Sequence, residues 1–227
     1  MNSLLSLLQL SDPGLPIGGF SHSAGLETYV QYEIVKDRRT AKEFIEGQLK
    51  YNLALTDAAF VSLAYDAVAT NEGRVLLQLD EQCTAVKLPK EIREASRKLG
   101  FRLLKIFPLL GEHHLIKGYK SAIASGEISG HYPIVFGALA CLLHIDKRDA
   151  LSGFFYNAAS AMVTNCVKLI PLGQQDGQEL LFSLHALIQK LVEQSLEPDG
   201  DMIGACCAGF DIRSMQHERL YSRLYMS

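Results

Sequence analysis

Residues 151–170 read LSGFFYNAASAMVTNCVKLI, and this stretch decides the fold. Its apolar side chains recur three and four residues apart, beginning with Leu151, Phe154 and Phe155. This spacing places them on one face of an α-helix, which has about 3.6 residues per turn. Asp146 precedes the stretch and is placed to cap the start of the helix. The stretch therefore predicts a long helix with a buried face.

The same helical spacing continues along most of the chain. A second apolar stripe covers 180–192, and Thr40 with Glu43 has the form of a capping box that opens a helix running towards residue 69. Further helices are expected over 3–10, 24–32, 74–86, 90–110, 112–123, 133–143 and 199–207. Almost nothing alternates with period two. The sequence predicts an all-α, single-domain bundle of roughly nine or ten helices, spanning 1–209, followed by a separate tail at 210–227.

Composition argues against nucleic acid and membranes as partners and favours a reducing compartment. The chain has 227 residues, 48% of them apolar, and a net charge of −3, which gives no global basic field for nucleic acid or an anionic membrane. The uncharged segment 150–167 is long enough to span a membrane, but its serines, asparagines and tyrosine indicate a buried core helix. The five cysteines form no disulfide framework, and no signal peptide is visible, so we expect a cytoplasmic protein.

The chain ends in an unusual amphipathic segment, 210–227. It interleaves apolar and aromatic side chains with arginines and contains no glycine or proline. Tyrosine, methionine and arginine are enriched in protein–protein contacts. Composition alone fits two readings, a docking tail and a last element packed on the protein's own core.

The glycine-rich loop 11–25 offers no complete catalytic motif. Gly14 and Gly19 have the spacing of a phosphate-binding loop, but Phe20 stands where the motif needs lysine. Ser21 and His22 invite a hydrolase reading, yet a nucleophile elbow requires glycine two residues after the serine. The scattered histidines and cysteines show no ligand spacing. We expect no catalytic residue, no cofactor and no metal ligand, and hence no enzyme.

The segment after the long helix forms a polar corner. Pro171 and Gly173 are placed to end that helix, and Gln174 or Asp176 to cap the next. The glutamine amides, including that of Gln178, then stand at the turn between two helices. This corner is either purely structural or a polar contact site for a partner.

Four segments, taken in order, resemble the urease accessory protein UreF family. They are 7–27 (LLQLSDPGLPIGGFSHSAGLE), 131–137 (HYPIVFG), 168–178 (KLIPLGQQDGQ) and 211–227 (DIRSMQHERLYSRLYMS). Each motif by itself is weak, but the match runs from about Leu4 to the last residue.

The resemblance implies a helical, dimerising protein that binds the accessory protein UreH or UreD. Together these would recruit the nickel-carrying GTPase UreG and deliver nickel to apo-urease. The chain would then be the bridging, non-catalytic regulator, with a tail that orders against its partner. The partner-binding residues that the resemblance implies are Gly18, Gly19, Phe20, Ser21 and His22 in the loop and Tyr221, Arg223, Leu224 and Tyr225 in the tail. To these we add, as expected contacts from the sequence itself, Lys168, Gln174, Asp176 and Gln178 at the corner and Arg213 in the tail.

Two positions depart from the family pattern. Some relatives carry tyrosine where this chain has Phe20, and others carry arginine where Lys168 stands. The first change removes a hydroxyl, and the second removes a bidentate donor.

Three other functions remain open at this point. The chain could act directly on UreG as a GTPase-activating protein by supplying a side chain to the nucleotide. It could be a stand-alone enzyme that uses Ser21 and His22, or it could bind nickel itself.

Overall fold

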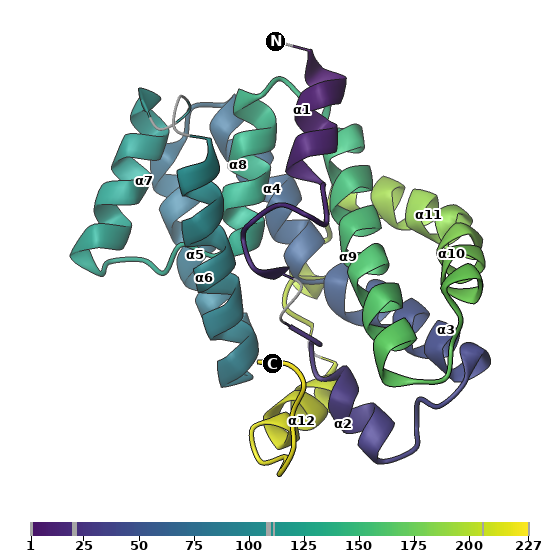
Figure 1. The fold of residues 1–227 in the computed structure, drawn as a ribbon. Helices are drawn as coiled ribbons and strands as arrows, with labels where there is room; N and C mark the ends of the chain where they lie inside the picture. Colours follow the sequence, from purple (N-terminus) through teal and green to yellow (C-terminus); the bar gives the residue numbers. More distant parts are fainter. Residues whose placement is uncertain (1, 20–21, 108–109, 111, 206, 227) are drawn as a thin grey trace.

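The expected long helix lies at the centre of the molecule as α9 (Lys147–Leu169) (Figure 1). The structure is a computed structural model that describes residues 2–226 except 20, 21, 108, 109, 111 and 206. Asp146 caps α9, as predicted, because its carboxylate accepts a hydrogen bond of 2.9 Å from the amide of Arg148. Leu151, Phe154 and Phe155 are buried, so the apolar stripe does face the core.

The described part of the chain is all helical and contains no strand, which confirms the predicted fold class. Its α-helices are α1 (Ser3–Leu10), α2 (Leu26–Gln31), α3 (Arg38–Gly47), α4 (Asp57–Ala69), α5 (Gly73–Val86), α6 (Lys90–Ile106), α7 (His114–Ser125), α8 (Tyr132–Leu142), α9, α10 (Gln174–Ser183), α11 (His185–Leu196) and α12 (Ala208–His217). Within these residues no helix combines the length and the apolar character that crossing a membrane requires.

Twelve α-helices stand in the described residues where nine or ten were expected. The helix expected over 40–69 is interrupted, because a π-helix follows α3 at Gln48–Leu53 and the backbone leaves helical geometry at Thr56. The expected helix at 180–192 is likewise divided, between α10 and α11 at Leu184. Apolar spacing continues across both breaks, so the period alone does not reveal them.

Two helix starts differ from expectation. Thr40 and Glu43 do not form the capping box; instead Asp37 caps α3, and Thr40 is its reciprocal partner one turn later. The helix expected over 199–207 is reduced to a short 3₁₀ turn, Gly200–Met202. Gly204 then adopts φ +80°, a left-handed conformation that ends helical geometry there.

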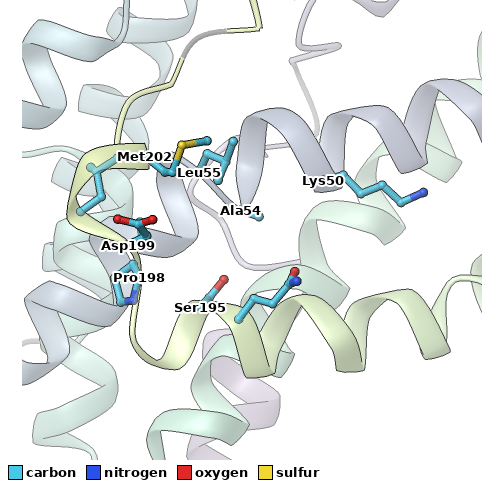
Figure 2. A pocket seen from close by; sticks show the side chains of 10 residues that line it. Lys50, Ala54, Leu55, Ser195, Pro198, Asp199 and Met202 are labelled. Atoms are coloured by element: carbon cyan, nitrogen blue, oxygen red, sulfur yellow. The ribbon is translucent and has the colours of Figure 1, made fainter.

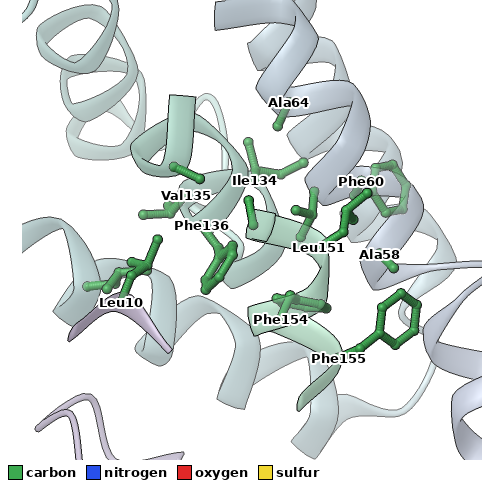
Figure 3. Packing of buried hydrophobic residues seen from close by; sticks show 14 of the residues in the cluster. Leu10, Ala58, Phe60, Ala64, Ile134, Val135, Phe136, Leu151, Phe154 and Phe155 are labelled. Carbon is green, nitrogen blue, oxygen red and sulfur yellow. The ribbon is translucent and has the colours of Figure 1, made fainter. Parts of the chain in front are cut away.

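The core forms where α4, α8 and α9 pack together. Figure 3 shows Phe60 of α4, Phe136 of α8, and Phe154 and Phe155 of α9 within this cluster. The rings of Phe136 and Phe154 meet edge to face, with centroids 5.1 Å apart. Such pairs are typical of aromatic cores.

Gly137 permits the close approach of α8 to α4. A Cβ atom at this position would lie 2.2 Å from the carbonyl oxygen of Val61. We expect Gly137→Ala to lower the free energy of unfolding by about 1–3 kcal/mol, because the two helices must separate. Urea denaturation measures this change. Gly118→Ala is the control, since nothing lies within 4 Å of its Cβ and alanine favours the helix; equal effects of the two changes would contradict the packing argument.

The start of α8 is held by a fully buried carboxylate on α5. Asp80 accepts hydrogen bonds from the amides of Ser129 (2.7 Å), Gly130 (3.0 Å) and His131 (2.7 Å). The hydroxyl of Tyr119 on α7 donates a fourth, of 2.7 Å. One side chain thus joins α5, α7 and the N-terminus of α8, where a negative charge is favourable.

His131 completes this buried network as a neutral ring. Its nitrogens lie 2.9 Å from the Thr84 hydroxyl and 3.1 Å from the Ser96 hydroxyl. Burial lowers the pKa of His131 to about 4, against the nearby charge of Asp80. The motif at 131–137 therefore serves packing and polar satisfaction inside the fold.

Candidate partner-docking site

The N-terminal loop, residues 11–25, is pinned to α9 by two asparagines. Asn157 donates to the carbonyl of Ser11 at 2.8 Å, and Asn165 donates to the carbonyl of His22 at 2.9 Å. Leu15 of the loop is buried in the core cluster. These contacts hold both ends of the described part of the loop, 11–19 and 22–25, against α9.

Arg102 of α6 supports the middle of the loop. Its guanidinium donates a 2.9 Å hydrogen bond to the carbonyl of Ile17. Gly18 follows with φ +88°, and a Cβ atom there would lie 2.1 Å from the Arg102 Nη1 atom. The left-handed backbone therefore favours glycine at position 18, and a side chain there would also displace the Arg102 guanidinium. At Gly19 no described atom lies within 4 Å of such a Cβ. Phe20 and Ser21 lie outside the described residues.

Two adjoining cavities open below the loop, between α6 and α9. They have volumes of about 210 Å³ and 290 Å³ and share walls that include Leu99, Tyr132 and Ala158. His22 lines the first, and Gly19 and Lys168 line the second. The fold therefore brings the loop and the end of α9 together around one space.

A buried ion pair forms part of the wall of these cavities. The Lys87 ammonium lies 2.8 Å from both carboxylate oxygens of Asp57. Burial disfavours the charge on Lys87, but the Asp57 carboxylate outweighs it and raises the Lys87 pKa. Lys87 and Asp57 therefore both carry a charge, and the two charges cancel, which suits a structural role.

His22 carries the one perturbed imidazole of the loop. Burial lowers the pKa of His22, and the positive charges of Lys98 and Arg102 lower it further. The ring is therefore neutral at pH 7.

The C-terminal segment packs on the chain that carries it. The boundary expected between residues 209 and 210 falls inside α12, and Phe210 and His217 are buried. α12 and α2 lie side by side at one end of the molecule (Figure 1), and the segment after α12 returns to the start of α6, where Arg223 pairs with Glu91. Ordering on a partner is therefore not needed to position this segment.

Glu27 of α2 fixes the last residues in place. Its side chain is only 6% exposed. One carboxylate oxygen accepts the Leu224 amide at 2.6 Å, and the other accepts the Tyr225 amide at 3.1 Å. The second oxygen also lies 2.9 Å from Nε2 of His217. We use the name tail clasp for the hydrogen-bonded cluster of Glu27, Glu91, His217, Arg223 and the backbone amides of Leu224 and Tyr225.

Glu91 of α6 supplies the second carboxylate of the tail clasp. It lies 2.7 Å from Nδ1 of His217 and 2.7 Å from the Arg223 guanidinium. The His217 ring thus lies between the two carboxylates, with one nitrogen facing each, and the Arg223 guanidinium donates to Glu91. Charge-assisted bonds of this kind are stronger than neutral ones.

The tail clasp holds the backbone and leaves several side chains facing solvent. Tyr221 is fully exposed, Leu224 is 68% exposed and Met226 is 59% exposed, whereas the Tyr225 side chain is buried. On α12, Arg213 stacks over the Tyr32 ring at 4.6 Å. The segment thus combines a fixed backbone with exposed apolar side chains.

The polar corner lies apart from the tail clasp. Asp176 accepts from the amide of Gly173 and pairs with Arg38 of α3 at 3.3 Å, so it closes the turn and bridges two helices. Gln174 and Gln178 are exposed on α10. α10 packs against α3, α9 and α11, whereas α12 packs against α2 and α6. Of the corner residues only Lys168 shares a cavity with the loop.

The described residues show no metal site, and a further cavity lies away from the residues expected to bind a partner. Among the described residues no three His, Cys, Asp or Glu side chains are arranged to hold a metal ion. A further cavity of about 220 Å³ lies beside the π-helix and is shown in Figure 2. Lys50, Ser195 and Asp199 line it, and none of the residues expected at a partner site does.

Sequence reasoning missed three residues that organise this region: Glu27, Glu91 and Arg102. Each binds a segment far away in the chain, and no spacing rule connects such positions. The available signal was a carboxylate at position 27 in a short helix whose first residues, Leu26 and Thr28, are buried. A buried carboxylate requires donors.

Comparison with known proteins gives one consistent result. A family model described as UreF matches residues 35–185. "Urease accessory protein UreF" of Actinobacillus pleuropneumoniae serotype 5b (strain L20) is 49% identical over 227 residues, covering all of both chains. The protein of the same name from Haemophilus influenzae (strain Rd) is 48% identical over 227 residues, all of this chain and 97% of that one. The one from Bacillus sp. (strain TB-90) is 36% identical over 227 residues, again all of both chains.

Proposed function

This chain belongs to the urease accessory protein UreF family, and from that premise we propose that it is the non-catalytic docking subunit of a urease maturation complex. In this role it bridges an accessory protein of the UreH or UreD kind and the GTPase UreG to apo-urease. We include in the proposal that it acts as a homodimer.

One observation carries the proposal most directly. The tail clasp fixes the amides of Leu224 and Tyr225 on a buried carboxylate while the side chains of Tyr221, Leu224 and Met226 face solvent. Apolar side chains that are exposed on a fixed backbone lose little entropy on binding, which favours docking. Ile212 and Met215 extend the same exposed character along α12.

The double variant Tyr221→Ala with Leu224→Ala tests this surface. The clasp uses only the backbone at position 224, so we expect the variant to fold normally. If these side chains are binding hot spots of about 2 kcal/mol, capture of the UreH or UreD partner weakens by about 30-fold. Surface plasmon resonance with the immobilised accessory protein measures this loss.

Phe182→Ala is the matched control, because Phe182 is 74% exposed on α10, away from the clasp. We expect it to leave partner affinity unchanged. Normal affinity of the double variant would sink the docking role of the tail.

The alternative is direct stimulation of UreG by a charged or amide side chain that this chain supplies to the nucleotide. In the tail, Arg223 is engaged with Glu91 and Arg213 with Tyr32 and Gln216, whereas Arg219 is exposed. An arginine finger raises hydrolysis by about 10³–10⁵-fold. GTP hydrolysis by UreG, measured with and without this chain, separates the two functions.

A further inference from the structure

The exposed face of α6 carries a basic stripe, of which only Arg102 donates a hydrogen bond within the site described above. From position 97 to the end of α6, every exposed residue is cationic or aromatic. The basic stripe consists of Arg97, Lys98, Phe101, Arg102 and Lys105. It stands on a protein whose net charge is −3, so the positive charge is local.

Most of these cations lack an internal counter-charge. Arg97, Lys98 and Lys105 form no ion pair with a carboxylate of the described residues. Arg102 is bound to a backbone carbonyl, which leaves its charge uncompensated. The Lys105 ammonium lies 4.2 Å from the centre of the Phe101 ring, which fixes both side chains.

A groove of about 390 Å³ runs beside the basic stripe. Arg97, Lys98 and Phe101 line it from α6, and Ile123 and Ser129 line the opposite wall. Glu94 also lines it, and it is the one carboxylate among these lining residues. The groove thus combines a cationic edge with an apolar contact at Phe101 and Ile123.

We infer that the basic stripe and its groove bind an acidic segment of a partner protein, one that carries an apolar residue between its carboxylates. The charge of the stripe is complementary to carboxylates, and the groove accepts the apolar residue. Rim charges of this kind speed association more than they strengthen the final complex.

Two other classes of partner fit less well. A nucleic acid duplex is opposed at long range by the net charge of −3. An anionic membrane surface requires exposed apolar side chains that insert beside the cations. Phe101 is the one large exposed apolar side chain on α6, and it is covered by Lys105.

The test uses the full chain and a fluorescein-labelled helical peptide in which glutamates one turn apart alternate with leucines. Stopped-flow anisotropy measures association at ionic strengths of about 0.01 M and about 1 M, where the Debye length is about 30 Å and about 3 Å. We expect the charge-reversal variant Arg97→Glu, Lys98→Glu, Lys105→Glu to associate about tenfold or more slowly at low salt. At high salt the difference disappears.

The control reverses three exposed cations elsewhere, Lys36→Glu, Arg74→Glu, Lys190→Glu, which gives the same net charge. We expect it to keep the wild-type rate within about twofold, since steering depends on the local field. Replacement of the three stripe cations by glutamine should give an intermediate rate.

Three results would overturn the inference. They are a charge-reversal variant that associates like wild type, a control that slows equally, and a DNA duplex or phosphatidylserine vesicle that binds through the stripe more tightly than the peptide.

Discussion

Deletion of residues 223–227 is expected to abolish urease activation while the helical fold persists. It removes the guanidinium that pairs with Glu91 and the two amides bound by Glu27. The buried Tyr225 ring is lost as well, but α12 retains Phe210 and His217 in the core. The deletion removes Leu224 and Met226 and releases the backbone that follows Tyr221. We therefore expect activation to fall by at least about 30-fold, the loss of one binding hot spot.

Activation of apo-urease in reconstituted extracts measures the functional loss, and far-UV circular dichroism checks the fold. Glu27→Ala in the full-length chain shows whether the position of the tail matters or only the presence of its residues. It releases the same backbone and removes no tail residue. We expect neither the deletion variant nor Glu27→Ala to activate apo-urease at the wild-type rate. A deletion variant that activates urease at the wild-type rate would exclude a docking role for residues 223–227.

Asp80→Ala is expected to cause the largest loss of stability. It leaves the amides of Ser129, Gly130 and His131 and the Tyr119 hydroxyl without their buried acceptor. Loss of one member of a buried, charge-assisted network costs about 3–5 kcal/mol. That is a large share of the roughly 5–15 kcal/mol by which a domain of this kind is stable.

Urea denaturation at pH 7 gives the change in unfolding free energy. Asp66→Ala is the control, because Asp66 is half exposed and pairs only with Lys147 among the described residues. Exposed pairs contribute about 0–1 kcal/mol. If Asp80→Ala costs no more than this control, the carboxylate does not hold the start of α8.

Helix content was predictable because apolar period is a local signal. The stripe beginning at Leu151 and the cap at Asp146 both appear in α9 as the sequence indicated. The breaks at Thr56 and Leu184 were not predictable, because the apolar spacing runs through them unchanged. The capping-box error at Thr40 has a similar cause: one sequence offers two overlapping boxes, and only the folded backbone selects Asp37.

The residues of the candidate site likewise include some that a sequence motif contains and contacts that only the folded chain reveals. The loop motif includes Gly18, whose left-handed backbone favours glycine, and its role in partner binding stays a prediction. The tail motif identified Arg223 and Tyr225, but it did not reveal that both are held by the chain itself. The backbone and the buried side chains of this segment pack on the chain itself, and its exposed side chains are those that we propose for docking a partner.

The sequence by itself determined the helical class, the buried face of α9 and the two terminal segments that carry the family resemblance, because each depends on residues close together in the chain. Only the tertiary structure decided how the termini meet. Glu27 binds the amide of Leu224 across 197 positions, and Glu91 reaches His217 across 126. No local pattern encodes such pairs, because they exist only after α2, α6 and α12 have packed and a buried carboxylate must find its donors.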